Sequence, residues 1–220
     1  MVNKTNFIIL ILLIILINFP LFSDANEEAQ TLLKKDIKIL FLGDSLTEGF
    51  GVESEEAFPS LLDSMLKQKG YDNVKIINAG ISGSTTASAV SRLKWYLKSK
   101  PEIRPEILFL ALGANDGLRG LSLKAMEQNL NSTIEIAISS GMKVILAGME
   151  IPPNYGVEYT NNFRDVFKAL ADKHKIAFMP YLLKDVGGFA HLNLPDGVHP
   201  NADGYKIVAA NVLPYILEKL

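Results

Sequence analysis

Short apolar runs alternate with amphipathic segments along most of the chain. Five apolar runs predict buried strands, at residues 37–42, 74–77, 107–112, 142–147 and 176–179. Five segments with apolar side chains at three- and four-residue spacing predict helices, at residues 57–69, 86–99, 123–140, 160–172 and 201–218. Gly70 and Gly141 mark helix ends, and Ser122 is a candidate N-cap. The chain therefore reads as a strand followed by a helix, five times over.

This alternation predicts an α/β fold with a five-stranded parallel sheet. Strands that are apolar throughout are typical of a sheet covered by helices on both faces, with right-handed crossovers. No internal repeat or Pro/Gly-rich linker interrupts the pattern, which indicates one domain. Polar loops at 43–49, 78–85 and 113–120 each follow the carboxyl end of a predicted strand. Ligands of open α/β sheets bind at that edge, so we expect these loops to converge.

The first 25 residues have a different character. Residues 7–17 are an unbroken apolar run behind Lys4, and Ser23 and Ala25 are small residues at positions −3 and −1 of a cut after Ala25. This pattern predicts a secretory signal peptide at 1–25 and an exported domain at 26–220, periplasmic or secreted. The alternative is an uncleaved membrane anchor, but the run is shorter than the ~20 apolar residues that a span needs.

Composition and charge narrow the chemistry that is open to the chain. The hydrophobic share of 48% and the charged share of 21% are typical of a globular protein. The net charge is −2 and no segment is strongly basic, which argues against a nucleic-acid partner. With no Cys and only three scattered His, disulfides, a thiol nucleophile and a thiolate-ligated metal are excluded. We expect no metal and no cofactor, and chemistry from hydroxyl, imidazole, carboxyl and amide groups.

A candidate nucleophile, Ser45, lies in Gly43-Asp44-Ser45-Leu46, directly after the first predicted strand. A serine at a tight strand-to-loop turn can present its hydroxyl above the sheet, and Gly43 lets the backbone turn. The alternative interpretation is a plain turn or helix cap, because Asp and Ser favour both. The chain contains no G-x-S-x-G, so this is not the nucleophile elbow of an ordinary α/β-hydrolase.

A candidate base, His199, lies in Asp196-Gly197-Val198-His199-Pro200, just before the last predicted helix. A neutral histidine is the usual base for a hydroxyl near pH 7, and Asp196 can fold back to orient the imidazole. The alternative is a solvated histidine in a surface loop. His191 lacks an obvious acidic partner, and His174 lies in a charged stretch typical of an exposed helix face.

Two further loops offer hydrogen-bond donors. Asn115, within residues 113–117, carries an amide that can donate to a developing oxyanion, and a glycine within 78–83 can expose its backbone N–H. Asn, Asp and Gly dominate ordinary turns, so each stretch alone also fits plain turn chemistry. Their common position at one edge of a single sheet favours a site.

Taken together, these blocks resemble the SGNH (GDSL-type) hydrolases over residues 37–216. The matching blocks follow the family's order and are Gly43-Asp44-Ser45-Leu46, Ile81-Ser82-Gly83, Gly113-Ala114-Asn115-Asp116 and Asp196-Gly197-Val198-His199-Pro200. The resemblance implies a three-layer α/β/α sandwich of flavodoxin-like type. It also implies that Ser45 is the nucleophile, that His199 is the base and that Asp196 orients His199. The implied oxyanion hole consists of Gly83 N–H, Asn115 Nδ2 and the Ser45 N–H.

Residues 115–120, 151–156 and 192–197 resemble one branch of this family, the periplasmic thioesterase/lysophospholipase/arylesterase group. That resemblance implies a serine esterase of small acyl esters and thioesters, with lysophospholipids as a further substrate class. It also places residues 117–122, and with them 148–157, beside the acyl chain. Ala114 and Ser84 depart from the branch pattern, which leaves the preferred chain length open. The alternatives are a carbohydrate O-acetylesterase of the same superfamily and a catalytically silent binding protein.

Overall fold

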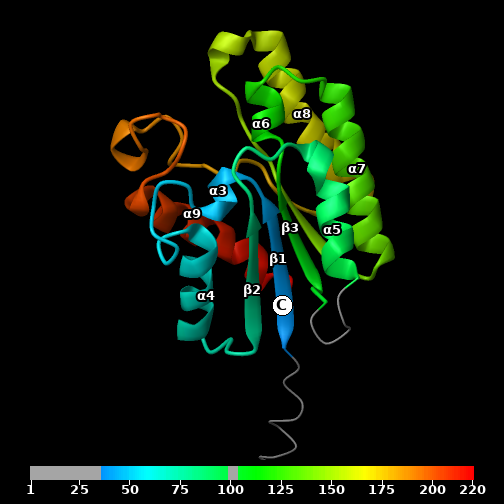
Figure 1. Cartoon of the computed structure of the whole chain (residues 1–220), viewed down its shortest axis with the longest axis vertical. Coiled ribbons are helices and arrows are strands. Elements are labelled where there is room, and N and C mark those ends of the chain that lie inside the picture. The colour runs from blue at the N-terminus through cyan, green and yellow to red at the C-terminus, as the bar shows by residue number, and fades with distance from the viewer. Residues whose placement is uncertain (1–35, 99–103) are drawn as a thin grey trace, which may run out of the picture. The chain divides into compact units, whose positions relative to one another are not determined.

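The computed structural model describes residues 36–98 and 104–220. Residues Ile37–Leu220 form a five-stranded parallel sheet with helices on both faces (Figure 1). The strands are β1 (Ile37–Gly43), β2 (Val74–Gly80), β3 (Ile107–Ala111), β4 (Lys143–Ala147) and β5 (Ala177–Met179). The helices are α3 (Ser45–Glu48), α4 (Phe58–Gln68), α5 (Ala89–Leu97), α6 (Ala114–Leu118), α7 (Leu123–Ser139), α8 (Val157–His174) and α9 (Ala202–Leu217). Short 3₁₀ turns occupy Thr86–Ser88, Pro153–Tyr155 and Ala190–Leu192.

The three predicted layers are confirmed. Helices α4 and α9 lie on one side of the sheet, and α5, α7 and α8 lie on the other (Figure 1). Each predicted strand and helix is present, with shifted ends. Strand β2 continues past the predicted end at residue 77, because its main chain pairs with β1 as far as Gly43 opposite Gly80. Side-chain pattern alone could not show this, since Asn78-Ala79-Gly80 is not an apolar run.

The core forms where the central strands meet the helices. Residues 39–42 of β1 and 107–111 of β3 are almost completely buried, which explains why these strands read as continuous apolar runs. Phe41 stacks on Phe109 with ring centroids 4.8 Å apart and meets Phe58 of α4 edge-on at 5.7 Å. Burying a side chain of this size contributes roughly 1.5–3 kcal/mol. Together these contacts fix β1 firmly under the loops that follow it.

The strand order is β2-β1-β3-β4-β5, which is the flavodoxin-like order. The chain leaves β1 toward β2 on one side and later returns to β3 on the other. A crevice opens beyond the carboxyl ends of the strands at such a switch point. The three loops that follow β1, β2 and β3 therefore meet above the centre of the sheet, as the sequence predicts.

The predicted signal peptide at 1–25 lies outside the described residues and stays a prediction, as does the domain boundary at residue 26. Over the part of the chain that the structure describes, no helix is both long and apolar enough to span a bilayer.

Candidate active site

Ser45 is presented by a short helix that follows β1 directly. The Asp44 carboxylate caps this helix by accepting a hydrogen bond from Leu46 N–H at 3.0 Å. A Cβ on Gly43 would collide with the Thr47 side chain, so the turn from strand to helix requires glycine there. The sequence predicts only a loop over 43–49, because a single helical turn is too short to show a periodic pattern.

The structure brings the candidate residues Ser45, His199 and Asp196 together. Ser45 Oγ lies 2.8 Å from His199 Nε2, and His199 Nδ1 lies 2.8 Å from Asp196 Oδ2. Asp196 Oδ1 also accepts hydrogen bonds from the backbone N–H groups of Val198 at 2.8 Å and His199 at 3.0 Å. The ionised carboxylate accepts from Nδ1, so Nδ1 carries the ring proton and Nε2 accepts the Ser45 hydroxyl proton.

Two opposing effects set the charge state of Asp196. Partial desolvation raises the pKa of its carboxyl, while the backbone N–H groups of His199 and Val198 and the His199 ring lower it. The lowering prevails, and the pKa of Asp196 falls to about 2. Asp196 is therefore ionised at neutral pH.

Ser45 and His199 line a hollow of about 230 Å³, called here the Ser45 hollow. Gly83 and Asn115 line the same space, so all of the predicted site residues except Asp196 border it. Within residues 36–98 and 104–220, no group accepts a hydrogen bond from the N–H of Ser45 or of Gly83. Two free backbone donors thus border the hollow that holds the Ser45 hydroxyl.

Asn115, in the first turn of α6, uses its amide within the protein. Its Nδ2 donates to Ser84 O at 3.0 Å and makes a long contact of 3.5 Å with Asp44 Oδ2. The second contact is at the limit of a hydrogen bond and is therefore weak. An oxygen entering the Ser45 hollow can compete for that second amide hydrogen while the bond to Ser84 is retained.

Asp44 is a completely buried carboxyl beneath the Ser45 turn. Burial raises its pKa to about 6, although the Leu46 N–H and the nearby His199 and Arg92 side chains partly offset this effect. Arg92 reaches the carboxyl ends of two strands, donating to Gly43 O at 3.0 Å and also to Ala79 O. The sequence pattern allows Asp44 as a helix cap, but neither its burial nor the contacts of Arg92 are visible in the pattern.

A second cavity, of about 320 Å³, continues from the Ser45 hollow. We call it the apolar groove; the residues that line both spaces are Leu46, Ala114, Leu118 and Val198. Farther along, its walls come from the segments after β4 and β5, including Ile151, Pro152, Pro153 and Leu183. Of the segment 148–157, which is expected beside the acyl chain, residues 149–153 line the groove. Leu121, which the sequence also predicts there, does not line the groove and is 42% exposed.

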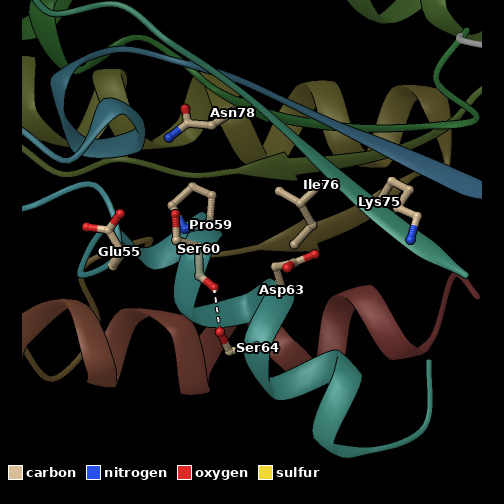
Figure 2. Close-up of a pocket in the computed structure, with 8 residues that line it drawn as sticks. All are labelled: Glu55, Pro59, Ser60, Asp63, Ser64, Lys75, Ile76 and Asn78. Carbon is tan, nitrogen blue, oxygen red and sulfur yellow. Dashed lines mark hydrogen bonds between the residues drawn. The ribbon is translucent and has the colours of Figure 1, made fainter. Parts of the chain in front are cut away.

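A separate hollow, of about 360 Å³, lies between α4 and the edge strand β2 (Figure 2). Figure 2 shows acidic, basic and hydroxyl side chains around it, and neither Ser45 nor His199 borders it. Asn78 does border it, and Asn78 Oδ1 accepts the Gly80 N–H at 2.9 Å. Of the two asparagines that follow apolar runs, only Asn115 borders the Ser45 hollow.

Three side chains at the site have no role in the sequence analysis. Glu48 Oε2 accepts the backbone N–H of Ser82 at 2.7 Å and also its hydroxyl. Arg119 donates to Gly83 O at 3.0 Å and lies 3.4 Å from Asn115 Oδ1. The Phe50 ring lies against the His199 ring, with centroids 4.6 Å apart. Their nearness in sequence to Ser45 or Asn115 is the only signal that could have indicated Glu48, Phe50 and Arg119.

Among the described residues, no group of three or more His, Cys, Asp or Glu side chains could hold a metal ion. The chemistry that these residues themselves can perform is proton transfer from a hydroxyl to an imidazole, beside free N–H donors and an apolar groove.

Residues 41–207 match the GDSL-like Lipase/Acylhydrolase family. The chain is 37% identical to Esterase TesA of Pseudomonas aeruginosa over 176 residues, which are 80% of this chain and 86% of that protein. It is 36% identical to Arylesterase of Vibrio mimicus over 183 residues, 83% of this chain and 90% of that one. It is 30% identical to Thioesterase 1/protease 1/lysophospholipase L1 of Escherichia coli over 171 residues, 78% of this chain and 79% of that one. A crystal structure of TesA superposes with a TM-score of 0.78 at 36% identity, covering 83% of this chain and 99% of that one.

Proposed function

The chain belongs to the GDSL-like Lipase/Acylhydrolase family and is a hydrolase of ester bonds, and we propose that it cleaves them with Ser45 as nucleophile and His199 as base. The observation that carries this proposal is the hydrogen-bonded chain from Ser45 Oγ through His199 to Asp196, with 2.8 Å at each link. Nucleophile, base and orienting carboxylate at such distances are the geometric signature of an activated hydroxyl.

The reaction follows from this geometry in two halves. His199 Nε2 takes the Ser45 proton as Oγ attacks the acyl carbonyl, and the imidazolium that forms is stabilised by Asp196. His199 then passes the proton to the leaving alcohol or thiol, and an acyl group remains on Ser45. Water, deprotonated by His199 in the second half, attacks this ester, and His199 returns the proton to Ser45 Oγ as the acyl–Oγ bond breaks and the acid leaves. Every proton moves through Nε2, and none is lost from Asp196.

The oxyanion of the tetrahedral intermediate would receive hydrogen bonds from three donors, Ser45 N–H, Gly83 N–H and Asn115 Nδ2. Support comes from the two free backbone N–H groups at the Ser45 hollow and from the weakly engaged second hydrogen of Asn115. Donors that are already aimed at the position where charge develops are among the largest contributions to acyl transfer.

We propose acyl esters and thioesters longer than acetate as substrates, with lysophospholipids as a further class. The support is the apolar groove, which opens from the Ser45 hollow at Leu118 and Val198 and, at about 320 Å³, has room for methylene groups. The names of the relatives, an esterase, an arylesterase and a thioesterase/lysophospholipase, agree with this range. A carbohydrate O-acetylesterase, the second candidate, has no need of such a groove, which disfavours it.

For the cellular location, we propose export with cleavage after Ala25, on the sequence pattern of residues 1–25 alone.

A fluorophosphonate probe tests the assignment of the nucleophile. We expect the intact protein to gain one covalent adduct, located by peptide mass spectrometry on Ser45, with loss of p-nitrophenyl butyrate hydrolysis at the same rate. Ser45→Ala should take no label. An adduct on another residue, or full activity in Ser45→Ala, would overturn the proposal, and a silent binding protein would show neither label nor turnover.

A further inference from the structure

The donor N–H of Gly83 belongs to a tight turn of four residues, Ile81–Ser84. Ser84 N–H donates to Ile81 O at 3.1 Å, which closes the turn. Gly83, the third residue, has φ of +75°, while Ser82 before it does not have a positive φ. These values describe a type II turn, in which the third residue has φ near +80°.

A type II turn has a close alternative, and the alternative changes the donor. In type I the second residue's ψ falls from about +120° to −30° and the third residue's φ from about +80° to −90°. Those two rotations turn over only the central peptide, here the Ser82–Gly83 peptide. The N–H of this peptide is the Gly83 donor, so its direction depends on which of the two turns forms. Among the described residues it has no acceptor that could hold it in place.

The peptides on either side of the central one are held by charged side chains from other loops. Glu48 Oε2 accepts both the backbone N–H of Ser82, at 2.7 Å, and the Ser82 hydroxyl. Arg119 donates to Gly83 O at 3.0 Å. Glu48 lies in α3, the same helix that carries Ser45, so its contact ties the turn directly to the helix of the nucleophile.

Arg119 acts on the side-chain donor as well. It lies 3.4 Å from Asn115 Oδ1, while Asn115 Nδ2 faces Ser84 O and Asp44 Oδ2. A cation beside Oδ1 and a carboxylate beside Nδ2 both oppose a flip of the amide, which would bring like charges together. One guanidinium therefore contacts Gly83 O and Asn115 Oδ1, which are oxygens of the two residues whose N–H groups border the Ser45 hollow.

We propose that Glu48 and Arg119 are positioning residues that hold the Ile81–Ser84 turn, and with it the Gly83 N–H, in the orientation that stabilises the oxyanion. This inference rests on the proposed function, because it presumes an oxyanion next to Ser45. Glu48 and Arg119 are both exposed, and an ordinary surface contact would contribute little. These two contacts differ because they hold the peptides on both sides of the Gly83 N–H donor, which sets where the turn lies beside Ser45.

Steady-state kinetics on p-nitrophenyl butyrate test the proposal. In Glu48→Ala and Arg119→Met, kcat should fall by about 10-fold or more with KM changed less than about threefold, because a misdirected oxyanion donor costs transition-state binding only. Glu48→Gln and Arg119→Lys keep an acceptor and a donor and should recover part of the loss. Glu218→Gln and Lys168→Met alter exposed side chains elsewhere, are the matched controls and should behave as wild type. Far-UV circular dichroism and Tm establish that each variant is folded.

Gly83→Ala separates positioning from a general surface effect. An added Cβ has space there, with Arg119 Nη2 the nearest atom at 3.4 Å, but an L-residue disfavours φ of +75° and favours the flipped turn. If Glu48 and Arg119 act through the Gly83 N–H donor, Arg119→Met should add little to the kcat loss of Gly83→Ala. Full additivity, a loss confined to KM, or an unchanged kcat in both single variants would overturn the inference. If the inference is overturned but the probe labels Ser45 and Asn115→Ala loses kcat, the proposed function is retained without the inference. An active Ser45→Ala would overturn both the proposed function and the inference.

Discussion

Asp196 holds His199 at two points, accepting the backbone N–H on Oδ1 at 3.0 Å and the ring Nδ1–H on Oδ2 at 2.8 Å. The three-residue separation in sequence makes this double contact possible within one turn of chain. One carboxylate thus sets both the position of the ring and its tautomer, and Nε2 is left to face Ser45. The consequences can be measured in variants of each partner.

Ser45→Ala and His199→Ala should each lower kcat/KM for p-nitrophenyl butyrate by at least about 10³-fold, and the double variant should lose little more. The reason is that nucleophile and base act in one proton transfer, so removing either removes the step. Ser45 Oγ bonds only to His199 among the described groups, so the fold should be unaffected. Independent, additive losses or near-wild-type rates in either single variant would contradict the assignment; circular dichroism checks the fold.

Asn115→Ala should lower kcat by about 10²–10³-fold with little change in KM, because an oxyanion donor binds mainly to the transition state. Asn78→Ala is the matched control, since Asn78 borders the hollow between α4 and β2 and not the Ser45 hollow. The measurement is a full Michaelis–Menten analysis of both variants. A large rise in KM with unchanged kcat would instead make Asn115 a substrate-binding residue, and an equal loss from Asn78→Ala would refute the choice of asparagine.

The free energy of unfolding should depend on pH through Asp44. Its pKa is raised from 3.8 to about 6 in the folded state, so between these values the folded protein binds more protons than the unfolded chain. Stability therefore decreases as pH rises from about 4 to about 6 and levels off above, by up to about 3 kcal/mol. Urea unfolding across pH 4 to 8 measures it, with Asp44→Asn as the comparison.

Asp44→Asn keeps an oxygen that can accept the Leu46 N–H but cannot ionise. Its stability should therefore fall less than that of the wild type over the same pH interval. Parallel pH profiles for the two proteins would show that the carboxyl of Asp44 titrates in its ordinary range after all.

Lengthening the acyl chain of p-nitrophenyl esters from acetate to at least butyrate should raise kcat/KM, since each buried CH₂ contributes up to about 0.8 kcal/mol. Leu118→Ala should weaken this gain, because Leu118 lines both the Ser45 hollow and the apolar groove. Leu121→Ala should leave it unchanged, because Leu121 lines neither space. A steep fall from acetate to butyrate, with release of acetate from acetylated xylan, would favour the carbohydrate-esterase alternative.

Expression of the full chain in a Gram-negative host should yield a periplasmic product that begins at Asn26. N-terminal sequencing of the purified protein checks the cleavage site. Intact Met1 on membrane-bound protein would instead support the anchor interpretation.

The layers of the fold and the grouping of Ser45, His199 and Asp196 can both be predicted from the sequence, because local signals mark them. Apolar runs mark β1 and β3, and Ser45 and His199 lie in short blocks at the ends of predicted elements. The contacts of Glu48 and Arg119 with the Ile81–Ser84 turn could not be predicted, because they depend on residues far apart in sequence. Glu48 and Arg119 are ordinary surface residues in sequence, and their contacts join loops 34 and 36 residues apart. Likewise, the raised pKa of Asp44 depends on burial, which no motif records.

Ser45 and His199 are separated by 154 residues, almost the whole length of the folded unit. Contacts between such distant parts of a chain close late in folding, after local helices and neighbouring strands have formed. During refolding from urea, helical signal should therefore return before hydrolysis does. With His199 as the proposed base, a chain still emerging from the ribosome cannot hydrolyse an ester until the segment around His199 has been made. The recovery of ester hydrolysis therefore reports the completion of folding, and it can be measured without a label on the protein.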